Sequence, residues 1–237
     1  MGNFDGVHLG HQHVIALARA HGPLGVVTFE PHPRQYFAPA SIPFRLMNAE
    51  ARANRLGKIG VTQLYELSFD ATLAGMTAET FAAAVLRDGL GVAHVTVGTD
   101  FHFGKGRAGT PETMRAAGHD MGFGVSVIDQ VGGDGEIFSS SAIRAELAQG
   151  DVRGAAGMLG HWWRVTGKVV GGAKRGTGLG YPTANIVLAP GTTLAHGIYA
   201  VTVDIGGERH DGAAYLGTRP TFDDGKPVLE VFLFDFD

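Results

Sequence analysis

The sequence predicts two different folds in one chain: an α/β part with a parallel sheet, followed by a small antiparallel β-barrel. Strand-like and helix-like stretches alternate up to Gly150, and apolar strands such as LGVVTF and HVTVG have no polar face. After Gly150, strands separated by glycine-rich turns dominate. With 237 residues and 44% hydrophobic side chains, there is enough material for buried cores. We therefore expect domains over residues 1–150 and 151–237.

The alternation in the first part defines nine elements. Apolar positions at helical spacing predict helices, and short apolar runs bounded by turn residues predict buried strands. The expected helices cover 10–20, 48–58, 77–88, 111–118 and 141–149, and the expected strands cover 24–29, 61–67, 93–98 and 124–129. Ligands of such open sheets gather at the carboxyl ends of the strands.

The second part begins with a short helical segment, DVRGAAGMLG, and continues with strands over 163–170, 197–205, 211–216 and 228–235. The boundary falls near residues 150–162. Trp162 and Trp163 at this boundary are expected to anchor packing rather than to bind a base.

Composition excludes several function classes. The absence of cysteine removes disulfides, thiolate metal sites and a cysteine nucleophile, and it suits a reducing compartment. A formal charge of −4 argues against a general affinity for nucleic acid. No apolar run approaches the length that spans a bilayer, and the N-terminus does not resemble a secretory signal. We expect a cytoplasmic protein with neither nucleic acid nor membrane as a partner.

The stretch GNFDGVHLGH (residues 2–11) places His8 and His11 one helical turn apart behind a glycine-containing turn. Free N–H groups and the dipole at a helix start attract anions, which favours a phosphate site. Gly6 and Gly10 let the backbone approach a ligand, and Asp5 is expected to cap the turn or to help hold a cation. The alternative is that both histidines merely occupy a polar helix start.

A second phosphate motif is FSSSAIR (residues 138–144). Ser139 and Ser140 are expected just before a helix, with Arg144 about one turn into it, so that hydroxyls, N–H groups and a guanidinium converge on phosphate oxygens. The alternative is an ordinary serine-capped helix whose arginine faces water.

The second part holds a different set of candidates. GGAKRGTGLGYPTAN is not a Walker A loop, because Thr177 follows Gly176 where lysine is required. Thr183 and Asn185 offer neutral oxygen ligands compatible with Mg²⁺, although a turn with an asparagine cap is the simpler reading of PTAN alone. Glu230 is a lone carboxylate in an apolar strand, which indicates either a functional role or an outward-facing edge position.

GNFDGVHLGHQ resembles the signature of the nucleotidylyltransferase domain of bacterial bifunctional riboflavin kinase/FAD synthetases. The resemblance continues in order through TFEPHP, VGTDFHFGKGRAG, FSSSAIR, GLGYPTAN, GIYA, GTRPTF and LEVFLFDF. It implies an α/β nucleotidylyltransferase domain with a Rossmann-like parallel sheet, followed by a β-barrel flavokinase domain. It also implies conversion of riboflavin to FMN and then to FAD, with ATP and Mg²⁺.

The resemblance assigns roles to the candidates. His8, His11 and Arg144 would stabilise charge during adenylyl transfer, Glu230 would accept the proton of the riboflavin 5′-hydroxyl, and Thr183 and Asn185 would hold the metal. Asp100 lies in the segment that resembles a flavin-contacting loop, where Phe101 and Phe103 either stack on flavin or pack in the core. As a residue that contacts ligand, His32 ranks below the other candidates. The remaining expected ligand contacts are Gly2, Asn3, Phe4, Asp5, Gly6, Gly10, Ser139, Ser140, Ser141, Gly176 and Gly180.

The resemblance is weakest at the chain ends. Family members place a strand before the GNFDGVH turn, whereas here Met1 adjoins Gly2, so we expect a chain shortened at both ends, with apolar surface exposed beside a loosened turn. Tyr215 stands where many relatives have asparagine. Two alternatives stay open: a single adenylyltransferase with an accessory barrel, and a non-catalytic flavin- or nucleotide-binding module. The sequence leaves the oligomeric state open.

Overall fold

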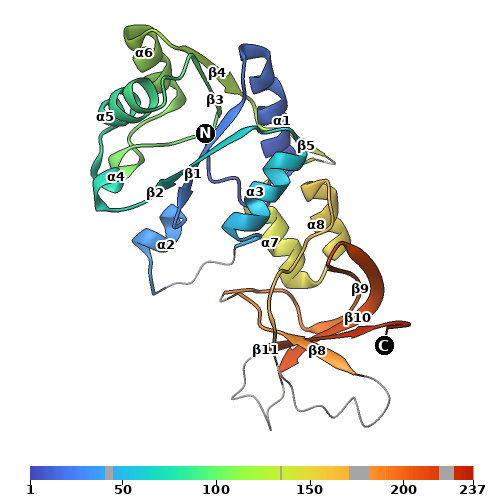
Figure 1. The fold of residues 1–237 in the computed structure, drawn as a ribbon. Helices are drawn as coiled ribbons and strands as arrows, with labels where there is room; N and C mark the ends of the chain where they lie inside the picture. The colour runs from blue at the N-terminus through green and yellow to red at the C-terminus, as the bar shows by residue number, and fades with distance from the viewer. Residues whose placement is uncertain (41–44, 134, 171–181, 190, 219–226, 237) are drawn as a thin grey trace.

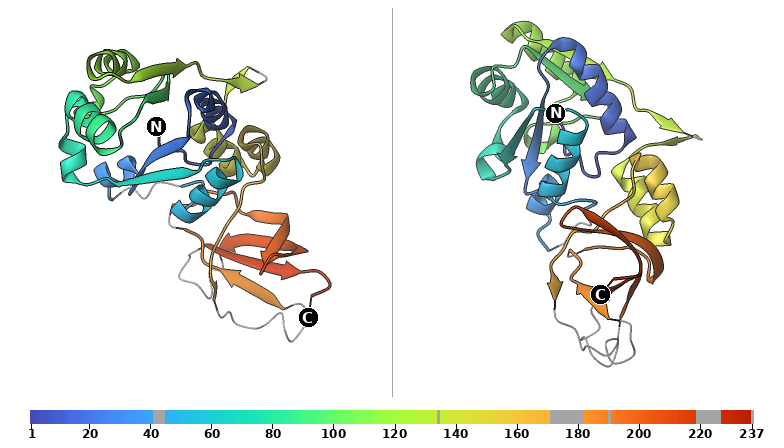
Figure 2. Two further views of the ribbon diagram at one scale, coloured as in Figure 1. Left: turned by 45° about the horizontal axis from the view of Figure 1, so that its top comes forward. Right: turned by 45° about the vertical axis from the view of Figure 1, so that its right-hand side comes forward.

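The computed structural model describes residues 1–40, 45–133, 135–170, 182–189, 191–218 and 227–236. Helices and parallel strands form the first part, and an antiparallel sheet forms the second. Two helices, α7 (Ser140–Gln149) and α8 (Val152–Leu159), lie between the two parts (Figure 1 and the right-hand view of Figure 2).

All nine elements predicted for the first part are present, with ends that differ from the prediction by at most three residues. The prediction for 77–88 is met by a short α-helix that continues as a π-helix, η2, and α1 is continued by a 3₁₀ turn, η1. The helices are α1 (Leu9–Ala18), η1 (Arg19–His21), α2 (Pro33–Phe37), α3 (Ala49–Lys58), α4 (Ala71–Gly75), α5 (Ala78–Phe81), η2 (Ala82–Gly89), η3 (Lys105–Arg107), α6 (Pro111–Met121) and α7. The strands are β1 (Gly25–Glu30), β2 (Gln63–Ser68), β3 (His94–Gly98), β4 (Gly124–Ile128), β5 (Gly132–Gly133) and β6 (Glu136–Ile137).

The parallel strands form two pairs rather than the single sheet expected. β1 pairs with β2 and β3 pairs with β4, both in parallel, and the described residues show no ladder between the pairs. The first residues of the chain lie between them, because the Met1 amine donates to the Thr96 carbonyl of β3 (3.2 Å) and the Gly2 N–H donates to the Val27 carbonyl of β1 (3.1 Å).

A cavity of about 300 Å³ occupies the same region between β1 and β3. Its lining includes Met1, Phe4 and residues of both strands, but not His8, His11 or Arg144. The apolar surface expected beside the turn therefore lines a partly open cavity. The turn itself is packed, since Phe4 and Val7 are buried.

The second part is an open five-stranded antiparallel sheet. Its strands are β7 (Val169–Val170), β8 (Thr183–Ile186), β9 (Gly197–Ile205), β10 (Glu208–Thr218) and β11 (Pro227–Leu233), in the spatial order β7, β8, β11, β10, β9. The antiparallel strands predicted for a small barrel are present, and closure of the barrel is not seen within the described residues, where β7 and β9 are the two edges. The strand expected over 163–170 is reduced to its last two residues.

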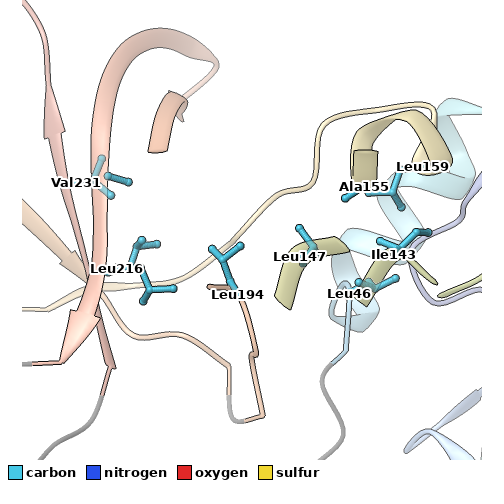
Figure 3. Packing of buried hydrophobic residues seen from close by; sticks show 10 residues of the cluster. Leu46, Ile143, Leu147, Ala155, Leu159, Leu194, Leu216 and Val231 are labelled. Atoms are coloured by element: carbon cyan, nitrogen blue, oxygen red, sulfur yellow. The ribbon is translucent and has the colours of Figure 1, made fainter. Parts of the chain in front are cut away.

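One hydrophobic cluster links the two parts (Figure 3). Leu46, Ile143, Ala155 and Leu159 form a group around the helices, and Leu216 and Val231 belong to the sheet. Leu147 and Leu194 lie between these two groups. Since apolar burial contributes roughly 25 cal/mol per Å², this shared core holds α7 and α8 against the sheet.

Two candidate active sites

The GNFDGVH turn has an unusual backbone that its own side chains hold in place. Phe4, Gly6 and Val7 have positive φ angles of 50°, 84° and 44°. Such angles cost roughly 1–3 kcal/mol in a residue other than glycine, so the surrounding structure must fix them. Phe4 and Val7 are buried, and a Cβ on Gly6 would lie only 2.8 Å from Leu46 Cδ1. The turn therefore needs glycine at position 6 and apolar anchors at positions 4 and 7.

His8 and His11 lie together, as the sequence predicts. Their rings stack with centroids 3.6 Å apart, and His8 caps α1 by accepting the His11 N–H on Nδ1 at 3.4 Å. Gly10 provides space for this pair, because a Cβ there would lie 3.1 Å from the His8 ring and 3.2 Å from the Phe138 carbonyl oxygen. His11 Nδ1 is buried without a hydrogen-bond partner among the described residues.

Both histidines are neutral at pH 7. Burial lowers the pKa of His8 to about 4, although Asp5 and Asp100 oppose this effect, and Arg144 adds to it. Burial, the neighbouring His8 and the chain's amino terminus lower the pKa of His11 well below its usual range. The rings can therefore donate N–H groups to a phosphate, while the cationic charge of this site comes from Arg144.

Asp5 has a different place from the one expected. It is only 3% exposed and neither caps α1 nor faces solvent. Its carboxylate accepts the backbone N–H of Leu46 (Oδ1 at 3.0 Å) and of Met47 (3.3 Å), and it forms an ion pair with the Arg144 guanidinium. Asp5 thus connects the first phosphate motif to the second.

The FSSSAIR motif begins α7 and touches the GNFDGVH turn. Ser139 caps the helix by accepting the Ala142 N–H at 3.1 Å. Ser140 belongs to the first turn of α7 rather than preceding the helix, and its hydroxyl donates to the Asp5 carbonyl at 2.8 Å. Ser141 is exposed. Ser140 and Arg144 therefore converge on the turn that carries His8 and His11.

His32, which the sequence analysis ranks below the other candidates, lies two residues after the end of β1. It caps α2 by accepting the Arg34 N–H at 3.1 Å. Its pKa is lowered by burial and by Arg45 and Arg144, while Asp5 opposes them, so His32 lies within electrostatic reach of the Asp5–Arg144 pair. The ring is thus at the carboxyl end of β1, where ligands of open sheets bind.

An ion-pair network at the ends of β1 and β2 escaped sequence reasoning. Arg52 of α3 is 1% exposed and contacts Glu66 (2.6 Å) and Glu30 (3.2 Å), while Arg45 also contacts Glu30 (2.6 Å). Burial alone would raise the pKa of Glu30, but Arg45 and Arg52 lower it. The sequence of α3 gave no sign that the side chain of Arg52 would be buried, because it is one of several charged residues in that helix. The network fixes the strand ends beside His32.

Asp100 follows β3, where the resemblance places a flavin-contacting loop. It is exposed, and its charge reaches His8. Phe101 and Phe103 stack with centroids 5.6 Å apart. Phe103 is buried in the core, which bears out the packing alternative for that residue.

The second candidate site lies on one face of the antiparallel sheet. Asn185 of β8 is directly opposite Glu230 of β11, and Thr183 is opposite Phe232. Residues opposite one another, and residues two apart on a strand, point to the same face. Thr183, Asn185 and Glu230 therefore share a face, while the buried Leu229 and Val231 point to the core.

Asn185 has the properties of a ligand-binding residue. It is 7% exposed, and its buried Oδ1 has no hydrogen-bond partner among the described residues. Unpaired buried acceptors are rare, and a neutral amide oxygen suits Mg²⁺. Tyr215, opposite Glu230 on β10, shares the face. Gly176 and Gly180 lie outside the described residues.

Two kinds of feature are absent from the described residues. Across the described ranges, no helix is long and apolar enough to cross a membrane. In the same part of the chain, no three His, Asp or Glu side chains gather as a metal site.

Two family models match the chain, one on each part. The model described as FAD synthetase matches residues 1–142, and the model described as Riboflavin kinase matches residues 159–237. The first match includes His8, His11 and Asp5, and the second includes Thr183, Asn185 and Glu230. Each candidate site therefore falls within its own family match, except that the first match ends two residues before Arg144.

Characterised relatives carry both names together. A bifunctional riboflavin kinase/FMN adenylyltransferase of Pseudomonas fluorescens is 42% identical over 242 residues, which cover 100% of this chain and 78% of the relative. Proteins with the same name from Escherichia coli (strain K12) and Bacillus subtilis (strain 168) are each 36% identical and cover 99% and 100% of this chain, and 77% of each relative.

A similar solved structure is titled a macrolide-efflux protein from Streptococcus pneumoniae. It has a TM-score of 0.85 and 32% identity, and covers 100% of this chain and 79% of that one. It shows the same fold, while the family models and the named relatives indicate the activities. The chain belongs to the family of bifunctional riboflavin kinase/FMN adenylyltransferases.

Proposed function

We propose that the two activities of this family occupy two separate sites in this chain. FMN adenylylation takes place where α1 and α7 begin, and riboflavin phosphorylation takes place on the face of β8 and β11. The observation that carries this proposal is the Asp5–Arg144 pair, which joins the two phosphate motifs more than 130 positions apart in the sequence. We also propose the division into domains over 1–150 and 151–237, which the two family matches support.

In adenylylation, an oxygen of the FMN phosphate attacks the α-phosphorus of ATP, and pyrophosphate leaves. Arg144 supplies positive charge, and the N–H groups of neutral His8 and His11 donate to oxygens whose charge grows in the transition state. Asp5 does not contact the phosphates in this proposal but holds the Arg144 guanidinium in position. The other proposed ligand contacts are Gly2, Asn3, Phe4, Gly6, Gly10, Asp100, Ser139, Ser140 and Ser141.

In phosphorylation, the 5′-hydroxyl oxygen of riboflavin attacks the γ-phosphorus of ATP, and ADP leaves. Glu230 accepts the hydroxyl proton. The donor set fits Mg²⁺, because Thr183 and Asn185 offer neutral oxygens and the Asn185 Oδ1 is buried and unpaired in the described structure. When bound, the ion neutralises phosphate charge. Gly176 and Gly180 are proposed to approach the phosphates.

ATP is a substrate of both reactions, and we infer that the protein acts in the cytoplasm. Its proposed small-molecule partners are ATP, riboflavin, FMN and FAD.

The experiment that tests this proposal is incubation with riboflavin, ATP and Mg²⁺, followed by chromatography of the flavins. A parallel reaction supplies FMN in place of riboflavin. We expect FMN and then FAD in the first reaction, and FAD alone in the second. Folded protein that yields neither product would disprove the proposal. If FAD formed in the reaction with FMN but no product formed in the reaction with riboflavin, only the adenylylation site would be supported.

A further inference from the structure

We propose that Trp163, together with His161, is a positioning residue for FMN adenylylation, although both residues lie in the riboflavin kinase match. This inference rests on the adenylylation site proposed above. If Trp163 and His161 have this role, the adenylylation site is incomplete without the segment 159–163, which lies outside the FAD synthetase match.

Trp163 and His161 each contact a backbone carbonyl beside the phosphate-binding turn. Trp163 Nε1 donates to the Leu46 carbonyl at 2.8 Å. His161 Nε2 lies 3.2 Å from the Gly6 carbonyl oxygen, inside the GNFDGVH turn. The indole N–H of Trp163 can only donate a hydrogen bond, so Trp163 is the donor and the Leu46 carbonyl is the acceptor.

Leu46 transmits the Trp163 contact to the site. Its carbonyl accepts from Trp163, and its N–H donates to Asp5 Oδ1 at 3.0 Å. Asp5 in turn holds the Arg144 guanidinium. Two hydrogen bonds and one ion pair therefore join the indole of Trp163 to the cation proposed to bind phosphate.

The surrounding packing makes this connection stiff. Leu46 is 1% exposed, belongs to the cluster shared by the two parts, and lies beside Ile143 of α7 (Figure 3). A Cβ at Gly6 would contact both Leu46 and Leu159 of α8. Gln12 adds a further link, since its amide donates to the Leu159 carbonyl at 2.9 Å and to the Val7 carbonyl at 2.8 Å. A shift of the segment after α8 would be transmitted to the turn.

His161 makes a second contact of the same kind. Its Nδ1 lies 2.9 Å from the Trp162 carbonyl oxygen, so each ring nitrogen faces an acceptor. Burial, with Arg55 and Arg164 nearby, lowers its pKa, although the two carbonyls oppose this. A neutral ring donates to one carbonyl at a time, which makes this contact weaker than that of Trp163.

The test uses the full-length chain, in which riboflavin phosphorylation is an internal measure of folded protein. Trp163→Phe removes the N–H donor but keeps an aromatic ring, and Trp162→Phe is the matched control because Trp162 is 63% exposed. We expect kcat for FMN adenylylation to fall about three- to tenfold in Trp163→Phe, the size of one lost hydrogen bond, with KM for ATP changed less than twofold. Riboflavin phosphorylation should stay within twofold, and Trp162→Phe should match the wild type.

A second pair of variants tests His161 independently. His161→Ala should lower adenylylation by about threefold, and His161→Gln should restore part of the loss, because its side-chain amide can donate to the Gly6 carbonyl. A lowered thermal midpoint with unchanged adenylylation per folded molecule in both Trp163→Phe and His161→Ala would overturn the proposal, as would an equal fall of both activities. If His11→Ala also left adenylylation unchanged, the site itself would be wrong, and not only the positioning role.

Discussion

The two candidate sites are assembled in different ways. The adenylylation site collects side chains from segments that are far apart in the chain: the turn before α1, the start of α7, and the residues beside α3. The phosphorylation site takes Thr183, Asn185 and Glu230 from two strands paired in one register. A single strand pairing is enough to align the second site, whereas the first depends on several tertiary contacts, among them the partly buried Asp5–Arg144 ion pair.

The two sites should therefore differ in how strongly substitutions elsewhere in the chain disturb them. Strand register places side chains on a fixed face, so substitutions elsewhere in the sheet should leave that alignment intact. In the first site, each contact positions the next, and loss of one partner leaves buried polar groups unsatisfied.

Glu230→Gln should abolish most riboflavin phosphorylation and spare adenylylation of supplied FMN. The amide cannot accept the hydroxyl proton, and removal of a general base costs about 100- to 10,000-fold in rate. Separate assays with riboflavin and with FMN measure the two effects. Glu208→Gln, at the exposed start of β10, is the control and should change neither rate. A parallel fall of both activities would show that the sites are not separable.

His11→Ala should lower FAD formation by about 100- to 1,000-fold, as for the loss of one donor to transition-state charge. FMN should still accumulate from riboflavin, because the β8–β11 face is unchanged. The flavins can be quantified by chromatography over time. His119→Ala is a suitable control, since that side chain is 90% exposed. Normal FAD formation in His11→Ala would remove this residue from the site.

Acid should destabilise the folded chain through His8. The unfolded chain takes up this proton near pH 6.5, whereas the folded chain does so only at about pH 4, so stability is fully present above pH 6.5 and is lost as the pH falls toward 4. The free energy of unfolding should fall by about 3 kcal/mol from this residue alone. Urea titrations at several pH values measure the loss.

His8→Asn provides the comparison for that measurement, because asparagine also caps helices but does not titrate. Its stability should depend less on pH between 6.5 and 4 than that of the wild type. Identical pH dependence in the two proteins would contradict the burial of a neutral His8.

Asn185→Ala should raise the Mg²⁺ concentration required for half-maximal phosphorylation about tenfold, as expected for the loss of one interaction with a charged ligand. Titration of Mg²⁺ at fixed ATP and riboflavin measures the change. Asn54→Ala, on the exposed side of α3, is the control. An unchanged Mg²⁺ requirement would indicate that Asn185 binds something other than the metal.

Much of the first site could be predicted because its local signals are strong. Helical spacing placed His8 and His11 together, and the serines before an apolar run indicated the start of α7. The role of Asp5 could not be predicted, because its partners at positions 46, 47 and 144 are distant in sequence. The same holds for Arg52, whose burial is compensated by Glu30 and Glu66, which are distant in sequence.

The described structure differs from the expected arrangement in two details. The parallel strands form two pairs, with Met1 and Gly2 between them, rather than one sheet. The antiparallel strands of the expected barrel are present, and closure is not seen among the described residues. Periodicity identifies which stretches are strands, but it contains no information on which edges meet.

By itself, the sequence determined the fold classes, the order of the elements and the residue types available to each reaction, because these depend on local periodicity and on side-chain chemistry. Only the tertiary structure decided which groups touch. It turned Asp5 from a cap into the partner of Arg144, set Asn185 opposite Glu230, and brought Trp163 to the carbonyl of Leu46. Those contacts depend on how distant segments pack, and packing is a property of the whole chain.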